Sequence, residues 1–366
     1  MSAAPPRVSL RRLDLARAGL DPAVAAERDA LVRRGAVPDP AVRAAARDIV
    51  SSVRAGGDRA VREASDRFGG SLGDGRLLLE RHELLAARDA LPVPIRRGLE
   101  TMIGNIRRFA ETQRPATAHT AIGPGIDIER RWVPLSRVGA YVPGGSAAYP
   151  SSLVMCAVPA RVAGVGEFVV ASPADRAGRL APVLLGAAGL LEVDAFLVAG
   201  GAQAVGALAY GLPEAGLAAV DRIVGPGNAW VTAAKLEVFG DVGIDLPAGP
   251  SEVMVLADRS ADVAHVAADL LSQAEHGPDS PALLVTPDRD VAEAVEAELA
   301  RQLATAGRRE FLERSLAACG LIVLAPDRDA AIAFVDAYAA EHLTVVIDDV
   351  EDAVARIRNA GSLFVG

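Results

Sequence analysis

The stretch EFVVASP (167–173), RLAPVLLGAAGL (179–190) and AFLVAG (195–200) decides the fold. Two short, mainly apolar runs enclose an apolar segment of helical length, and GAQAVGALAYG (201–211) followed by DRIVGPG (221–227) repeats the alternation. Strands that are apolar along their whole length and separated by helices are typical of a parallel sheet covered on both faces. The alternation therefore predicts an α/β domain.

A second series of buried strands lies further along the chain. Its members are VMVLAD (253–258), PALLVTPD (281–288), LIVLAP (321–326) and HLTVVID (342–348), and helical patterns separate them. GSLFVG (361–366) also reads as a strand. We therefore expect an α/β protein with two Rossmann-like domains that contain parallel sheets, preceded by a helical N-terminal arm over residues 1–33.

Composition and charge exclude several classes of protein. The chain has 366 residues, of which 51% are apolar, enough to bury large cores, so it is not disordered. Its net charge is −9 and Lys235 is its single lysine, which argues against nucleic acid as a partner. The N-terminus lacks the apolar run of a signal peptide, and no clean apolar span of membrane-crossing length occurs. These features predict a cytoplasmic protein with no membrane partner.

Four junctions rich in Gly and Pro follow predicted strands, where open α/β sheets bind ligands. They are YVPGG (141–145), AGGAQ (199–203), VGPGN (224–228) and PAGPSE (247–252). Each alone reads as an ordinary tight turn, and none is the G-x-G-x-x-G dinucleotide motif. Four together, with Gln203 and Asn228 within two residues after glycines, favour a ligand site, because amide side chains can bind a nicotinamide or ribose and glycines let a ligand approach the backbone.

Two polar pairs are candidates for chemistry. Gln273 and His276, in SQAEHGPDS, lie three residues apart at the end of a predicted helix and read either as half of a metal site or as a capped helix end. Glu341 and His342, at the start of a predicted strand, are suitable general bases, although adjacent residues usually point apart. Cys156 and Cys319 read as small core residues and not as nucleophiles.

Taken together, the motifs resemble those of the histidinol dehydrogenase family over roughly residues 30–366. The segments that carry the resemblance, in the family's order, are VPLSRVGAYVPGGSAAYPSS (133–152), GGAQAVGALAYG (200–211), VDRIVGPGNAWVTAAK (220–235), IDLPAGPSEVMVLAD (244–258), DLLSQAEHGPDS (269–280) and YAAEHL (338–343). The resemblance implies an oxidoreductase of histidine biosynthesis that converts L-histidinol to L-histidine through L-histidinal, with two NAD⁺ and one zinc ion.

The resemblance also implies roles for individual residues. NAD contacts are implied for Tyr141, Gln203 and Asn228, and substrate contacts for Ser251, Gln273, His276 and His342. Gln273 and His276 are also implied zinc ligands, and Glu341 and His342 the acid/base pair.

The family fold implies two incomplete Rossmann-like domains in an intertwined homodimer. We expect residues 34–140 with 253–366 to form a first, discontinuous domain, and residues 141–252 to form the second, NAD-contacting domain. Family members continue beyond position 366 with further zinc and substrate ligands, so we expect this chain to be C-terminally incomplete and its own activity to be impaired. The alternatives are a dehydrogenase of another small polar alcohol, and an inactive paralogue that binds dinucleotide and dimerises.

Overall fold

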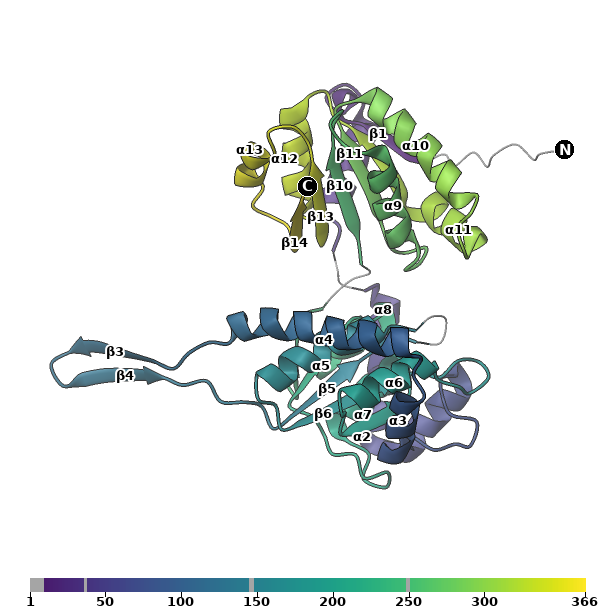
Figure 1. The fold of residues 1–366 in the computed structure, drawn as a ribbon, viewed down its shortest axis with the longest axis vertical. Coiled ribbons are helices and arrows are strands. Elements are labelled where there is room, and N and C mark those ends of the chain that lie inside the picture. The colour runs from purple at the N-terminus through teal and green to yellow at the C-terminus, as the bar shows by residue number, and fades with distance from the viewer. Residues whose placement is uncertain (1–9, 36–37, 145–147, 248–250) are drawn as a thin grey trace. The chain divides into compact units, whose positions relative to one another are not determined.

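The computed structural model describes residues 10–35, 38–144, 148–247 and 251–366. The chain divides into two compact units (Figure 1). We call residues 36–249 the continuous unit, and residues 1–35 together with 250–366 the split unit. No helix of the described residues combines the length and the apolar character needed to cross a membrane.

The continuous unit is built on a six-stranded sheet in the order β2-β7-β6-β5-β8-β9. Its strands are β5 (Arg137–Tyr141), β6 (Glu167–Ser172), β7 (Ala195–Val198), β8 (Arg222–Val224), β9 (Gly243–Ile244) and β2 (Leu78–Leu79). All of its pairings are parallel except that of β2 with β7. The predicted parallel sheet is therefore present, with one short antiparallel edge strand.

Helices cover both faces of this sheet. Val169 and Ala171 of β6 belong to one core with α2 (Pro40–Phe68), α7 (Gly201–Tyr210) and α8 (Ala229–Val238). The alternate residues Phe168 and Val170 belong to a second core with α3 (Arg81–Asp89), α4 (Val93–Gln113), α5 (Pro150–Val162) and α6 (Pro182–Leu190). Since successive strand residues point to opposite faces, the two cores lie on opposite sides of the sheet.

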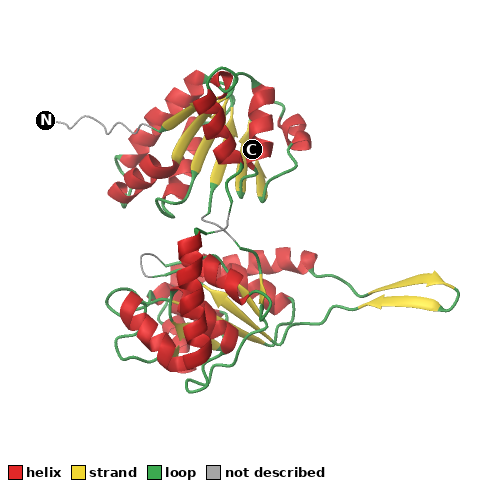
Figure 2. Ribbon diagram, turned by 180° about the vertical axis from the view of Figure 1, so that it is seen from behind, coloured by secondary structure: helices red, strands yellow, loops and turns green. Residues whose placement is uncertain are grey.

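The split unit contains a second six-stranded sheet, and every one of its pairings is parallel (Figure 2). The order is β1 (Arg11–Asp14), β12 (Gly320–Leu324), β11 (Ala282–Thr286), β10 (Val253–Ala257), β13 (His342–Val346) and β14 (Ser362–Val365). One face packs on α9 (Val263–Ala274), α10 (Arg289–Leu303) and α11 (Arg309–Cys319). The other packs on α1 (Pro22–Val32), α12 (Arg328–Tyr338) and α13 (Val350–Arg356).

The structure differs from the expected domain boundaries in two places. Residues 36–140 belong to the unit that contains β6, not to the unit of residues 253–366, because the apolar side of α2 packs against α7, with Val53 and Val205 in one core. The expected N-terminal arm is also part of a domain. Its residues 11–14 form the edge strand β1, paired with β12, and a short 3₁₀ helix (Leu15–Arg17) and α1 follow.

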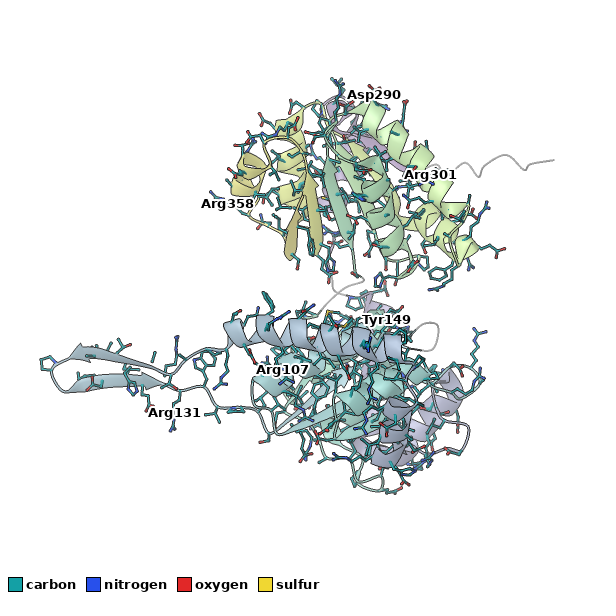
Figure 3. The ribbon with its side chains drawn as sticks, viewed as in Figure 1. Arg107, Arg131, Tyr149, Asp290, Arg301 and Arg358 are labelled. Carbon is teal, nitrogen blue, oxygen red and sulfur yellow. The ribbon has the colours of Figure 1, made fainter. Side chains whose placement is uncertain are left out.

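A two-stranded hairpin extends from the continuous unit, formed by β3 (Ala118–Gly123) and β4 (Ile126–Arg130). Arg131 lies directly after it, in the extended segment that leads back to β5 (Figure 3). The hairpin pairs with no other strand of the described residues. The side chains of Ile122, Ile126 and Ile128 are more than half exposed.

Candidate functional site

The continuous unit has a cavity of about 930 Å³ at the carboxyl ends of its central strands. Tyr141, the last residue of β5, Gln203 in the first turn of α7, and Asn228, four residues after β8, all line it. β5 and β8 lie side by side, and the chain continues in opposite directions across the sheet from them, so the cavity lies at a topological switch point, where α/β sheets bind ligands. The structure therefore brings together the three residues expected to contact NAD.

Two of these side chains also hold the walls of the cavity. The Tyr141 hydroxyl accepts a hydrogen bond from the backbone N–H of Gly201 at 3.3 Å, and burial raises the pKa of this hydroxyl, so it stays neutral. The side-chain oxygen of Asn228 caps α8 by accepting from the backbone N–H groups of Trp230 (3.1 Å) and Val231 (3.2 Å). Because the side-chain oxygen of Asn228 accepts these two bonds, its NH₂ group is the part that can donate a hydrogen bond to a ligand.

The turn between β8 and Asn228 depends on Gly225. Its φ of +104° is a conformation that L side chains rarely adopt, and a Cβ here would lie 2.3 Å from the carbonyl oxygen of Tyr141. The carboxylate of Asp245 accepts from the N–H of Gly225 at 2.8 Å, and the ammonium of Lys235 donates to its carbonyl at 2.9 Å. Lys235 is buried and pairs with Asp245, whose side chain is partly exposed. The sequence motifs did not predict this pair, although a single lysine within an apolar helix is a signal of an unusual role.

The cavity fits a dinucleotide in size and donors. Its volume lies at the upper end of the range of small-molecule sites, and its walls combine glycine backbone with an amide, a phenol and an indole. Gly144 and Gly200 pack so close to the chain at Pro173 that a Cβ on either would lie under 3.0 Å from a neighbouring atom. Glycine at both positions therefore keeps this side of the cavity free of side chains.

The remaining candidates all belong to the split unit. The side-chain NH₂ of Gln273, in the last turn of α9, donates to the backbone carbonyl of Ser251 at 2.5 Å, and Gln273 is buried. α9 ends at Ala274, so His276 lies beyond the helix, with its backbone N–H bonded to the carbonyl of Gln273 at 3.0 Å. His276 is exposed whereas Gln273 is buried, and because His276 lies beyond the end of α9, the two residues do not share a face of this helix although they are three apart in the sequence.

Glu341 and His342 do not point apart, because Glu252 contacts both. The carboxylate of Glu341 accepts from the backbone N–H of Glu252 at 3.2 Å, and Nδ1 of His342 lies 3.2 Å from the carbonyl oxygen of Glu252. The same Nδ1 lies 3.7 Å from the carboxylate of Glu341. Because Glu252 directly follows Ser251, the structure connects the pair at 341–342 with Ser251 and Gln273.

The donor chemistry at 273 and 276 fits zinc, since an amide oxygen and an imidazole are both suitable ligands. Their number does not suffice, because a catalytic zinc has three protein ligands. Within residues 10–35, 38–144, 148–247 and 251–366, no group of three or more His, Cys, Asp or Glu side chains could hold a metal ion. The described residues therefore do not complete a zinc site by themselves.

The two cysteines are poor nucleophiles. Burial raises the pKa of the Cys156 thiol to about 12, and burial also raises the pKa of Cys319. Both thiols are therefore protonated near neutral pH, and the thiolate is the reactive form.

Comparison with known proteins shows which proteins the chain is similar to. The model of the histidinol dehydrogenase family matches residues 32–366. A histidinol dehydrogenase of Leifsonia xyli is 47% identical over 342 residues, which are 92% of this chain and 78% of that protein. The histidinol dehydrogenase of Mycobacterium bovis is 46% identical over 99% of this chain and 82% of its own length. A crystal structure of the enzyme from Elizabethkingia anophelis superposes with a TM-score of 0.85 at 30% identity, covering 98% of this chain and 80% of that one.

Proposed function

Since the chain belongs to the histidinol dehydrogenase family and is an oxidoreductase, we propose that it oxidises L-histidinol to L-histidine in two NAD-dependent steps. The observation that carries the proposal is the hydrogen-bonded group in the split unit, where Glu252 connects a carboxylate–imidazole pair with Ser251 and Gln273. The close similarity to histidinol dehydrogenases does not favour another alcohol or an inactive paralogue.

We assign the cofactor to the cavity of the continuous unit. Tyr141, Gln203 and Asn228 line it, and the neutral phenol and the two amides supply donors for ribose hydroxyls or a carboxamide. When bound, NAD⁺ accepts the hydride in each oxidation. The substrate is assigned to Ser251, Gln273, His276 and His342 in the split unit.

The acid/base steps belong to Glu341 and His342. His342 accepts the proton of the substrate hydroxyl while the carbon loses its hydride, and an aldehyde results. Glu341 then takes a proton from water as that water adds to the aldehyde, and His342 returns its proton to the former carbonyl oxygen, giving a hydrate. His342 accepts a proton from the hydrate in the second oxidation, which leaves the carboxylic acid. The side chains of His342 and Glu341 are 37% and 48% exposed, so both are accessible to a ligand.

Gln273 and His276 are proposed to contribute to a zinc site. Zinc would supply a positive charge that polarises the hydroxyl oxygen of the substrate. Metal analysis of purified protein, with His276→Asn as comparison, tests the assignment. Equal zinc content in the two proteins would contradict it.

We also propose that the protein is a cytoplasmic homodimer. The hairpin of β3 and β4 supports self-association, because an isolated two-stranded sheet with exposed isoleucines is marginal in water. Sedimentation velocity on the wild type and on Ile122→Asp with Ile128→Asp tests this, and the double substitution is expected to yield monomers. A wild-type protein that sediments as a monomer at all concentrations would refute the dimer.

The enzymatic proposal is tested with purified protein, L-histidinol and NAD⁺. Two NADH are expected for each histidine formed, and His342→Asn is expected to lower the rate about a hundredfold or more while NAD binding persists. Production of NADH from other amino alcohols but not from L-histidinol would overturn the choice of substrate. Unchanged kinetics of His342→Asn would remove this residue as the base.

A further inference from the structure

The side chain of Glu252 lies at the centre of a network that no catalytic role explains. Its carboxylate accepts from Nε of Arg34 at 2.9 Å and also pairs with Nη2 of the same guanidinium. It further accepts from the hydroxyl of Tyr338 at 3.1 Å and from the backbone N–H of Glu341 at 3.2 Å. With a side chain only 13% exposed, Glu252 is largely withdrawn from solvent and fully engaged.

Arg34 and Tyr338 are themselves fixed relative to each other. The guanidinium of Arg34 lies 3.3 Å from the centre of the Tyr338 ring and donates to the backbone carbonyl of Tyr338 at 2.5 Å. Arg34 follows α1, and Tyr338 is the last residue of α12. The carboxylate of Glu252 is therefore held by the ends of two helices that pack on the same face of the sheet.

The backbone of Glu252 contacts the catalytic pair. Its N–H donates to the carboxylate of Glu341, and its carbonyl oxygen lies 3.2 Å from both the backbone nitrogen and Nδ1 of His342. The register of the sheet brings the two residues together, because β10 and β13 run parallel with Val253 beside His342. Any shift of Glu252 therefore moves the acceptor of His342.

The contact fixes the state of the imidazole. A carbonyl oxygen can only accept, so Nδ1 of His342 carries the hydrogen, and the carboxylate of Glu341 near the same nitrogen favours this tautomer further. In the neutral ring, Nε2 then has the lone pair. The ring of Phe364 in β14 stacks on His342 with centroids 6.3 Å apart and planes at 23°, which restrains the orientation of the ring.

We propose that Glu252 is a positioning residue that, through Arg34 and Tyr338, holds its own carbonyl against Nδ1 of His342 and so keeps Nε2 free as the proton acceptor. The role of Nε2 as a base rests on the proposed function, whereas the tautomer and its dependence on Glu252 do not.

Nuclear magnetic resonance of the full chain labelled with ¹⁵N-histidine tests the proposal. At a pH above about 8, where histidine is neutral, the long-range ¹H–¹⁵N pattern reports which ring nitrogen carries the hydrogen. The signals that disappear in the spectrum of His342→Asn are those of His342, which assigns them among the five histidines of the chain. We expect the Nδ1–H form in the wild type and a shift toward the Nε2–H form, the one preferred in water, in Glu252→Ala.

Matched variants separate positioning from stability. Tyr338→Phe keeps the ring beneath Arg34 and removes one hydrogen bond to Glu252, so a smaller shift of the same sign is expected, and this variant also decides the proposal if Glu252→Ala does not fold. Glu252→Gln keeps the shape and is expected to recover part of the wild-type pattern. Glu293→Ala, on the exposed side of α10, is the control and is expected to match the wild type.

Kinetics give the second measurement. Glu252→Ala is expected to lower kcat about tenfold to a hundredfold, with KM for NAD⁺ within about twofold of wild type. A wild-type His342 in the Nε2–H form, or an unchanged tautomer in both Glu252→Ala and Tyr338→Phe, would overturn the proposal. Because the tautomer is observed without turnover, a protein that does not oxidise L-histidinol would refute the proposed function and leave this test intact.

Discussion

At the scale of single residues, burial decides what the ionisable groups do. Lys235 is 2% exposed and pairs with Asp245, and this pair binds both the N–H and the carbonyl of Gly225. Lys235, the only lysine of the chain, thus shapes the turn that leads to Asn228. Removing Asp245 would leave the buried ammonium of Lys235 without its partner, whereas removing Lys235 leaves the partly exposed carboxylate of Asp245 without one.

We expect Lys235→Met to lower the free energy of unfolding by about 2–3 kcal/mol, because Asp245 is still 27% exposed and keeps some solvation. NAD affinity is expected to fall as well, since the turn at Gly225 loses a donor. Urea denaturation followed by circular dichroism measures the first effect, with Lys235→Arg as the charge-preserving comparison. An unchanged midpoint in Lys235→Met would show that the ion pair contributes no net stability.

Cys156 supports a second expectation at this scale. Burial raises the pKa of the thiol to about 12 in the folded protein, whereas the pKa of a cysteine thiol in the unfolded chain is about 8.5. The stability this group contributes is therefore complete below pH ~8.5 and is lost as the pH rises toward 12. Cys156→Ala is expected to retain both oxidation steps and to show a weaker loss of stability in alkali. Loss of aldehyde oxidation in this variant would restore a thiol mechanism.

At the scale of elements, the sequence predicted the buried strands well and the edge strand poorly. β12 is apolar throughout, β11 is apolar except for its last residue Thr286, and both strands are fully buried, so the sequence pattern alone was enough to predict them. β1, with the sequence RRLD, buries only Leu13, and such a short pattern resembles an irregular arm. The relation between Glu341 and His342 was also beyond the sequence, because it depends on Glu252, which is 89 residues away from Glu341.

β14 gives a prediction about an edge element. The carboxylate of Asp336 in α12 accepts from the backbone N–H groups of Arg358 (2.6 Å) and Asn359 (2.9 Å), which lie between α13 and β14. Arg358 is labelled in Figure 3. These bonds hold the pKa of Asp336 below its usual value. Asp336→Ala is therefore expected to speed hydrogen exchange of the β14 amides about tenfold, the equivalent of one to two hydrogen bonds.

The pH dependence distinguishes charge from shape at Asp336. A carboxylate with a lowered folded pKa stabilises above its unfolded value of about 3.9, and this contribution is lost as the pH falls below it. Asp336→Asn retains an acceptor oxygen but cannot titrate, so protection of β14 is expected to vary less with acid pH in this variant than in the wild type. If protection of the β14 amides falls equally with acid pH in the wild type and in Asp336→Asn, a carboxylate other than that of Asp336 causes this pH dependence.

At the scale of the whole molecule, the sequence indicated two parallel sheets but not the partition of the helices between them. The amphipathic patterns of α2 and α4 fit either sheet. An apolar helix face shows that the helix packs against a core, but it does not show which sheet provides that core. Only the packing of Val50 and Val53 with α7 assigns α2 to the continuous unit. The split unit, in contrast, needs both ends of the described chain, because β1 completes its sheet.

This partition predicts that residues 36–249 fold by themselves and bind NADH. Both faces of their sheet are covered by helices of the same segment, and every described residue that lines the large cavity lies within it. We expect the isolated polypeptide to unfold cooperatively in urea and to bind NADH with an affinity within about threefold of the full chain. Trp230 lines the cavity, so its fluorescence should report binding, and Trp230→Phe should remove that signal. If the isolated polypeptide folds but the fluorescence of Trp230 does not change at saturating NADH, the cofactor does not bind in this cavity. Because folding is measured separately, loss of binding in this experiment cannot be attributed to an unfolded polypeptide.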